Sequence, residues 1–224
     1  MSQPARSLSQ PARSLSLPAR SLSLPDDSLS LAGAPGGSGA RTRRVTPRPL
    51  DRLRELFAKV DAFFANASAR HGGRMACATG CSDCCRRRFS VTSIEADALR
   101  EALAALPEAE RAALAGRARA GDPGVCPALD GEGRCALYAA RPLICRTHGL
   151  PIRFAPAGGR ALPVVDACPK NFVGEDLDAI EASSVLDQTT LSTVLAALDM
   201  AHADAAGRPR GQRAAIAAVL SGEG

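Results

Sequence analysis

Four cysteines fall within nine residues of this chain, at Cys77, Cys81, Cys84 and Cys85. The other four of its eight cysteines follow downstream, at Cys126, Cys135, Cys145 and Cys168. Cysteines at such short spacings are typical of metal or redox sites, and a metal site supplies folding free energy that a small core lacks. The chain has no Trp and one Tyr, so its core is short of aromatic bulk. We therefore predict that the chain folds around bound metal.

The spacing inside the first cluster predicts how its thiols are shared. Cys77 and Cys81 are four residues apart, and Cys81 and Cys84 are three apart. In a helical or turn-like segment these three thiols point the same way, so that one metal centre can collect them. Cys84 and Cys85 are neighbours whose side chains should diverge. One of the two is expected to serve a second centre or to bridge a polynuclear one.

Eight thiolates fit two four-ligand sites, or one cluster plus a structural zinc. Cys126-Pro127 and Cys168-Pro169 resemble the Cys-Pro pairs found around iron–sulfur clusters. Sulfur ligands suit zinc and iron–sulfur clusters alike, and they do not suit magnesium or calcium. The predicted cofactor is therefore an iron–sulfur cluster or zinc. His148 follows Cys145 at a workable zinc spacing, but with eight thiols present we expect it to pack beside the site.

The net charge of +5 does not indicate a nucleic-acid partner. Residues 1–48 hold seven arginines and two aspartates, which leaves 21 basic and 21 acidic residues for 49–224. A nucleic-acid-binding domain should carry its own basic face. The sequence has no signal peptide and no apolar run of membrane-spanning length, so the expected location is the reducing cytoplasm. Metal ions are the predicted partners, and no protein partner is indicated.

The chain divides into a tail and one domain. Residues 2–29 repeat a seven-residue unit with a proline in every copy, at Pro4, Pro11, Pro18 and Pro25. Proline inside a helix costs about 3 kcal/mol, so this period cannot be a coiled coil. We predict a disordered, low-complexity tail over 1–48 and a single cysteine-cluster domain over 49–224.

The fold class predicted for the domain is mainly α, with helices flanking an irregular cysteine-rich segment that contains a small β-hairpin. Apolar residues from Leu53 to Ala67 follow a helical period that Gly72-Gly73 ends. Further helices are expected after a capping box at Thr92 and Glu95, over about 107–120, after a cap at Thr189/Thr190, and from Pro209. The hairpin is expected to join 152–154 to 162–165.

The cysteine pattern resembles that of a known family. Cys77-x3-Cys81-x2-Cys84-Cys85, followed by Cys126-Pro127-x-Leu129 and by Cys135-x2-Tyr138-x2-Arg141-Pro142-x2-Cys145-Arg146, is similar to the YkgJ-type cysteine-cluster family over about 75–170. That family is described as a zinc- or iron-chelating domain. The resemblance implies that the eight cysteines are ligands. It also implies that Tyr138, Arg141, Pro142 and Arg146 surround the bound cofactor, where arginines would offset thiolate charge.

The leading hypothesis is a metal-binding protein without an assigned reaction, and the second is an enzyme that uses the cluster for methyl transfer or redox chemistry. The flagellin lysine N-methylase is a relative of the family with a similar cysteine cluster. Cys77, Cys81 and Cys84 also match the spacing of the radical S-adenosylmethionine motif, but Asp83 stands where that motif usually has an aromatic residue. The sequence shows no glycine-rich cofactor loop and no general-base constellation. A disulfide-rich or thiol-redox protein is the third hypothesis.

Overall fold

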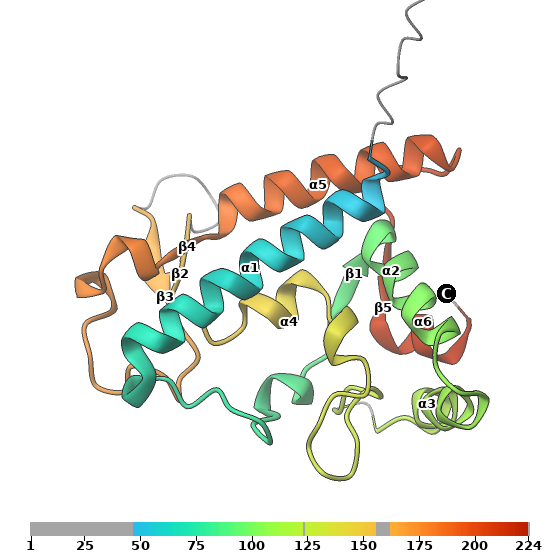
Figure 1. Cartoon of the computed structure of the whole chain (residues 1–224), viewed down its shortest axis with the longest axis horizontal. Helices are drawn as coiled ribbons and strands as arrows, with labels where there is room; N and C mark the ends of the chain where they lie inside the picture. Colours follow the sequence, from blue (N-terminus) through green and yellow to red (C-terminus); the bar gives the residue numbers. More distant parts are fainter. Residues whose placement is uncertain (1–46, 123, 156–161, 224) are drawn as a thin grey trace, which may run out of the picture. The chain divides into compact units, whose positions relative to one another are not determined.

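Two long antiparallel helices form one side of the protein. The computed structural model describes residues 47–122, 124–155 and 162–223. Helix α1 (Pro49–His71) begins at a proline and buries Leu53, Phe57, Val60 and Ala67, which confirms the helical period of this stretch. Helix α5 (Gln188–Ala205) lies along α1 (Figure 1). The cap of α5 is Asp187, whose carboxylate accepts from the Thr190 N–H, and not the predicted threonine pair.

A small sheet packs against these two helices. Strands β2 (Ile152–Phe154) and β3 (Val164–Asp166) pair antiparallel, which confirms the predicted hairpin, while the connection at 156–161 lies outside the described residues. Strand β4 (Leu186–Asp187) adds a parallel neighbour to β2. Ile152 and Leu186 belong to the hydrophobic cluster of α1 and α5, so this sheet extends the first core.

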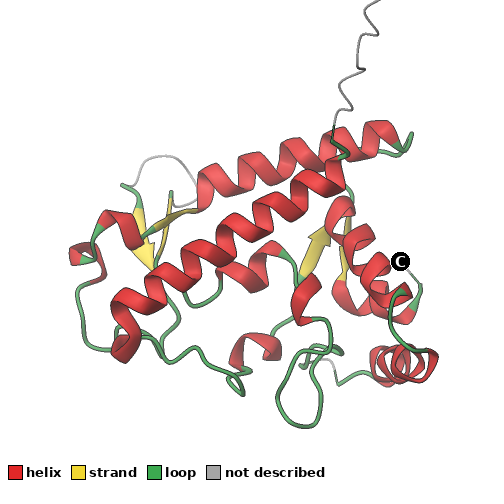
Figure 2. Cartoon of the chain, in the orientation of Figure 1, coloured by secondary structure: helices red, strands yellow, loops and turns green. Residues whose placement is uncertain are grey.

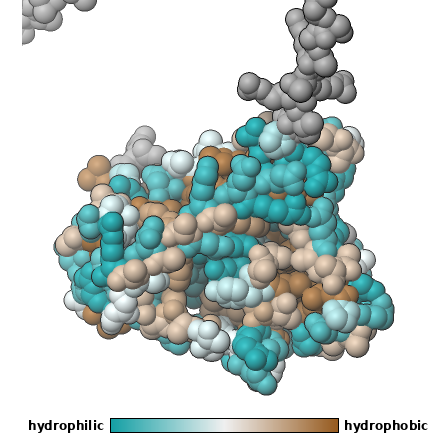
Figure 3. Space-filling view, viewed as in Figure 1, coloured by the Kyte–Doolittle hydropathy of each residue, from teal (hydrophilic) through white to brown (hydrophobic). Residues whose placement is uncertain are grey.

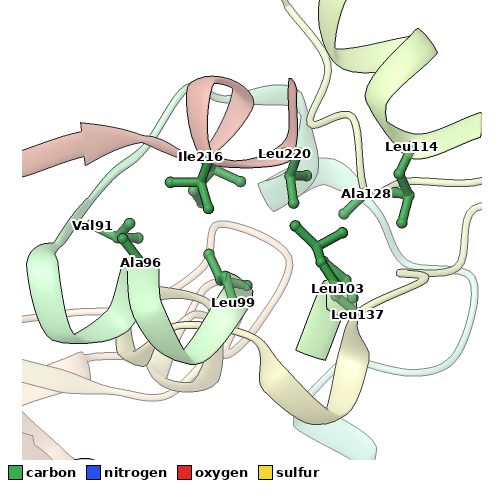
Figure 4. Close-up of a cluster of buried hydrophobic side chains, with 10 residues drawn as sticks. Val91, Ala96, Leu99, Leu103, Leu114, Ala128, Leu137, Ile216 and Leu220 are labelled. Atoms are coloured by element: carbon green, nitrogen blue, oxygen red, sulfur yellow. The ribbon is translucent and has the colours of Figure 1, made fainter. Parts of the chain in front are cut away.

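A second core joins three other helices. Helices α2 (Ser93–Ala104), α3 (Glu108–Ala120) and α6 (Ile216–Ser221) surround it. Figure 4 shows its side chains pointing toward one another: Val91, Ala96, Leu99, Leu103, Leu114, Ala128, Leu137, Ile216 and Leu220. On the face drawn in Figure 3, hydrophobic residues gather where α2 and α6 lie, and hydrophilic residues predominate over the neighbouring ends of α1 and α5. The burial of this core therefore depends on the C-terminal helix α6, which packs against α2 and α3.

The last helix was predicted to start at Pro209, and this predicted start is wrong. Helix α6 starts only at Ile216, because the preceding residues form strand β5 (Arg213–Ala215), which pairs antiparallel with β1 (Ser90–Thr92). The backbone of 213–215 is satisfied by this distant strand instead of by a helical turn. Gly211, with a φ of +72°, provides the turn before β5.

A buried carboxylate connects the two cores. The predicted capping box is confirmed, since Glu95 accepts from the backbone N–H and hydroxyl of Thr92 at 3.0 and 2.9 Å. Its other oxygen accepts from the N–H of Leu143 at 2.9 Å. Leu143 opens the short helix α4 (Leu143–Thr147), which carries Cys145 and which the sequence analysis did not predict. Glu95 thus fixes the start of a cysteine-bearing element.

The remaining chain is mostly loop with 3-10 turns, as Figure 2 shows. The turns are η1 (Gly72–Arg74), η2 (Asp83–Arg86), η3 (Tyr138–Ala140), η4 (Leu177–Ala179) and η5 (Ala182–Ser184). The predicted disordered tail falls on 1–48, of which 1–46 lie outside the described residues. Within the part of the chain that the structure describes, no helix has the length and apolar character needed to cross a membrane.

Candidate metal centre

All eight cysteines line one hollow of about 670 Å³. They come from the loop at 77–85, from the irregular stretch between α3 and α4, from α4 itself and from the loop after β3. None is in a disulfide, and each side chain is partly exposed. The fold therefore collects thiols that are up to 91 positions apart in the sequence, from Cys77 to Cys168, around a common space.

The loop that carries the first four thiols is turn-like. The Cys81 N–H donates to the Ala78 carbonyl at 3.0 Å, and Gly80 takes a φ of +92° inside this turn. Gly133 approaches the Gly80 carbonyl closely, which joins this loop to the one before Cys135. The 3-10 turn η2 then carries Cys84 and Cys85. Of the two local conformations left open above, the turn is the one adopted.

Cys84 and Cys85 do not diverge as expected from their adjacency. Their side chains are hydrogen-bonded to each other, which lowers the pKa of Cys84 to about 6 despite its burial and raises the pKa of Cys85. Of the two thiols, Cys84 is therefore the first to ionise. The tight 3-10 turn brings neighbouring sulfurs together, and a thiol that donates to a thiolate stabilises that charge.

Four further thiols around the hollow resist ionisation. Burial raises the pKa of Cys77, Cys126 and Cys135, and it raises that of Cys145 to about 12. The negative charges of neighbouring cysteines add to this effect in each case. Several buried thiolates cannot share one hollow without a compensating cation.

Asn171 is a site residue that the sequence analysis missed. Its side chain is buried, with the residue 3% exposed, and its amide nitrogen donates to Cys77 Sγ at 3.3 Å and to the Gly149 carbonyl at 2.6 Å. Its oxygen accepts from the Ala76 N–H at 2.8 Å, and its own N–H donates to the Cys168 carbonyl at 2.8 Å. Asn171 thus joins three cysteine-bearing segments. Its position three residues after Cys168 was the one available signal.

Gly149 lets these segments approach each other. It has a φ of +100°, and a Cβ at this position would lie 2.4 Å from Cys77 Sγ. Any side chain here would displace the first thiol of the cluster, because carbon and sulfur cannot approach so closely. The surroundings of Cys77 thus depend on a glycine that is 72 positions away in the sequence.

Of the four residues predicted to surround the cofactor, Tyr138, Arg141 and Pro142 line the hollow. The Arg141 guanidinium lies 4.0 Å from the centre of the Tyr138 ring. Its positive charge acts to lower the pKa of the thiols of Cys84, Cys135 and Cys145, whereas burial acts to raise each of these pKa values. His148 also lines the hollow, where burial and then the charge of Arg87 lower its pKa. Arg141 therefore favours negative charge on these sulfurs, whereas the lowered pKa of His148 favours a neutral imidazole.

Arg146 is not among the residues that line the hollow. Its guanidinium is paired with Asp61 of α1, lies 4.2 Å from the centre of the Phe57 ring, and donates to the carbonyls of Ala139 and Arg141. Arg146, which directly follows Cys145 in the sequence, therefore ties α1 to the loop before α4.

The donor set fits a thiophilic metal, although the thiols stand apart. Within the described residues, no group of three or more His, Cys, Asp or Glu side chains is close enough together to hold a metal ion. The chemistry of eight soft sulfur donors nevertheless suits zinc or iron, and it suits no hard cation. Binding would have to draw the sulfurs inward into the hollow.

The comparison with known families agrees with this donor set. Residues 76–156 match the model of the CxxCxxCC family, described as a "putative zinc- or iron-chelating domain". This part of the chain is therefore similar to a CxxCxxCC domain. In this chain three residues separate the first two cysteines of the motif. The matched stretch contains seven of the eight cysteines, and Cys168 lies beyond it together with Asn171. No curated protein and no solved structure matches the chain.

Proposed function

We propose that this protein binds zinc or an iron–sulfur cluster through its eight cysteine thiolates. The observation that carries the proposal is that all eight thiols, from four separate parts of the described fold, line one hollow. Unrelated buried cysteines have no reason to converge in this way. The CxxCxxCC domain is of a zinc- or iron-chelating class, which agrees with this donor set.

Several groups of the chain support thiolate ligation. The hydrogen bond with Cys85 lowers the pKa of Cys84, which favours the thiolate form that binds metal. Arg141 offsets part of the negative charge, and Asn171 donates a hydrogen bond to the sulfur of Cys77. Donors of this kind orient a ligand and tune its basicity. A reducing compartment such as the cytoplasm would keep the eight thiols available.

Anaerobic purification followed by metal analysis tests the proposal. We expect bound zinc, or bound iron with inorganic sulfide and absorbance near 400 nm, which Mössbauer spectroscopy would then classify. Stoichiometric zinc in a colourless protein would select zinc. Full-length protein that contains neither metal, and that takes up neither on anaerobic reconstitution, would contradict the proposal.

The size of the hollow supports a second candidate function, a cluster-dependent enzyme. A volume of about 670 Å³ falls in the range of small-molecule pockets, and His148 and Arg87 add polar groups to its lining. A methyl-transfer or redox reaction beside the cluster is the form this function would take. If the reduced protein holds iron, added S-adenosylmethionine should change its electron paramagnetic resonance spectrum; an unchanged spectrum counts against the methyl-transfer form.

A further inference from the structure

The hollow has an apolar wall in addition to its thiols. Helix α6 contributes Ile216, Ala217 and Leu220 to the lining, and helices α2 and α3 contribute Leu99 and Ala118. These five side chains are the apolar wall. Leu99, Ile216 and Leu220 belong to the second core, where they point toward one another (Figure 4), and Ala118 packs against that core. Helix packing therefore fixes this wall in place.

Loop residues add more apolar surface to the same hollow. Phe89, Val125 and Leu129 line it, and each of the three is only partly buried. The Phe89 carbonyl accepts from the Ile216 N–H at 3.1 Å, which holds the Phe89 backbone at the start of α6. Apolar surface that faces water inside a hollow is unfavourable, and an apolar ligand would remove it from water.

The hollow is also larger than metal ligation requires. Its volume is about 670 Å³. A water molecule accounts for about 30 Å³ of the liquid, and a metal ion is no larger. Sulfurs drawn inward by a metal would narrow the side formed by loops, whereas the apolar wall is held by the packing of α2, α3 and α6. Space for a small organic molecule therefore remains beside the wall.

Arginines give the hollow an excess of positive side chains. Five arginines line it, against the two aspartates Asp83 and Asp122. Asp83 already pairs with Lys170 at 2.6 Å, and two of the five arginines pair with carboxylates outside the lining. Within the described residues, Arg87 and Arg119 have no carboxylate partner, and both are exposed. An anionic group on a ligand would supply the missing countercharge.

Arg119 is the arginine that the structure places next to the apolar wall. It follows Ala118 in α3, and its guanidinium donates to the carbonyl of Ser221 at 3.2 Å. Ser221 ends α6 and directly follows Leu220, which is part of the wall. A guanidinium has five N–H donors, so this one hydrogen bond leaves others for a ligand.

We propose that the apolar wall and Arg119 form a binding site for a small anionic amphiphile, an aliphatic carboxylate of medium chain length. The alkyl chain would lie against Leu99, Ile216 and Leu220, and the carboxylate would pair with the Arg119 guanidinium. This inference goes beyond metal binding and does not depend on it, because no residue of the site is a thiol. If the cluster-dependent enzyme is the function, the same site defines the class of its substrate.

Calorimetric titration of the anaerobically purified, full-length protein with hexanoate, octanoate and decanoate at neutral pH tests the inference. We expect one saturable site whose affinity rises about fourfold with each added methylene, until the wall is covered, because each buried methylene contributes free energy. Octylammonium, which has the same chain length as octanoate and the opposite charge, should bind more weakly. Equal affinities for these two probes would overturn the anionic class of the ligand.

Helix α3 offers two variants with matched controls. Arg119→Gln should weaken octanoate binding about threefold to fivefold, which is the range for an exposed ion pair, without weakening octylammonium binding. Ala118→Leu places a larger side chain in the hollow and should weaken decanoate binding at least tenfold. The controls are Arg111→Gln and Ala113→Leu, which lie on α3 outside the lining and should bind as the unaltered protein does.

Metal content measured in the same samples separates this inference from the proposed function. Protein that carries metal but binds none of the carboxylates contradicts the amphiphile site and leaves metal binding standing. Protein that binds the carboxylates but carries no metal, and takes none up, contradicts the proposed function alone. Because Arg119 is exposed, Arg119→Gln tests the site even if Ala118→Leu fails to fold. Octanoate binding unchanged by Arg119→Gln would overturn the inference.

Discussion

Gly149 has no Cβ, and both its backbone conformation and the position of the Cys77 thiol depend on this. We expect Gly149→Ala to destabilise the protein by about 1–3 kcal/mol, because the φ of +100° disfavours a side chain and the new Cβ would meet Cys77 Sγ. Urea unfolding measures this free energy. Gly116→Ala is the control: this position lies inside α3 with open space around it, so alanine should stabilise by up to about 1 kcal/mol. Equal effects at the two positions would contradict the role of Gly149.

Asn171 is the residue whose polar atoms hold the cysteine segments together. We expect Asn171→Leu to cost about 1–3 kcal/mol or more, because the Ala76 N–H and the Gly149 carbonyl would lose their partner in a buried place. The variant should also bind metal more weakly, which a competition assay with a chromophoric chelator measures.

Asn66→Leu serves as the control for this prediction. Asn66 is exposed on α1, so its substitution should change the unfolding free energy by no more than about 0.5 kcal/mol and leave metal affinity unchanged. A wild-type metal affinity in Asn171→Leu would show that Asn171 serves stability alone.

Between elements, Arg146 connects α1 to the segment that leads into α4. Its guanidinium is buried against Phe57, and it reaches Asp61 and two carbonyl groups. We expect Arg146→Met to lose about 2–3 kcal/mol of unfolding free energy, since hydrogen bonds to a charged group are broken in a buried place. Arg70→Met should cost less than about 1 kcal/mol, because Arg70 pairs with Glu181 at the surface, with both side chains more than half exposed. Similar losses in both variants would refute the proposed connection.

Asp97 connects α2 to the end of α5 and makes their association depend on pH. Burial raises its pKa, but hydrogen bonds with Arg208, His202 and Arg100 outweigh burial and hold the pKa at about 2. A carboxyl group with a lowered pKa stabilises the fold above its unfolded value of about 4, and this contribution is lost as the pH falls toward 2.

We therefore expect Asp97→Asn to be less stable than the unaltered protein at pH 7, by about 1–3 kcal/mol. The difference should shrink as the pH falls from about 4 to about 2, because Asp97 itself becomes neutral there. Urea unfolding across this pH range measures both curves. A difference that stays constant down to pH 2 would contradict the ionic role of Asp97.

The elements that were predicted are those whose signals are local. The apolar period of α1, the capping box at Thr92 and the proline before α3 each act within a few residues, and all three are present in the structure. Helix α4 and strand β5 were missed, because α4 is capped by the distant Glu95 and β5 is paired with the distant β1. Contacts with residues that are distant in the sequence produce no periodic pattern of apolar residues.

For the whole molecule, metal removal should affect the two halves differently. The thiols of Cys126 and Cys135 pack against the core of α2, α3 and α6, whereas α1 and α5 share a separate core. On treatment of the metal-loaded protein with a strong chelator, we expect amide hydrogen exchange to accelerate most at 124–140, since a structural metal site contributes folding free energy. Exchange in α1 and α5 should change little.

Cys145→Ser should reproduce the chelator's pattern in part, with lower metal content and faster exchange at 124–140. Ser82→Ala, which alters a side chain in the same loop as the first thiols without removing one, is the control. Uniform protection of 124–140 with and without metal would contradict a structural role for the metal.

The amino-acid sequence by itself determined the class of the fold and which donor atoms the candidate site offers. The sulfur donors, their spacing and the amphipathic helices are properties of residues close together in the chain, so they can be read without the tertiary structure. Only the tertiary structure decided that the eight thiols surround one hollow, that Asn171 and Gly149 join the segments around Cys77, and that Arg146 turns toward α1. These features depend on contacts between distant segments, which are made only when the two cores have packed.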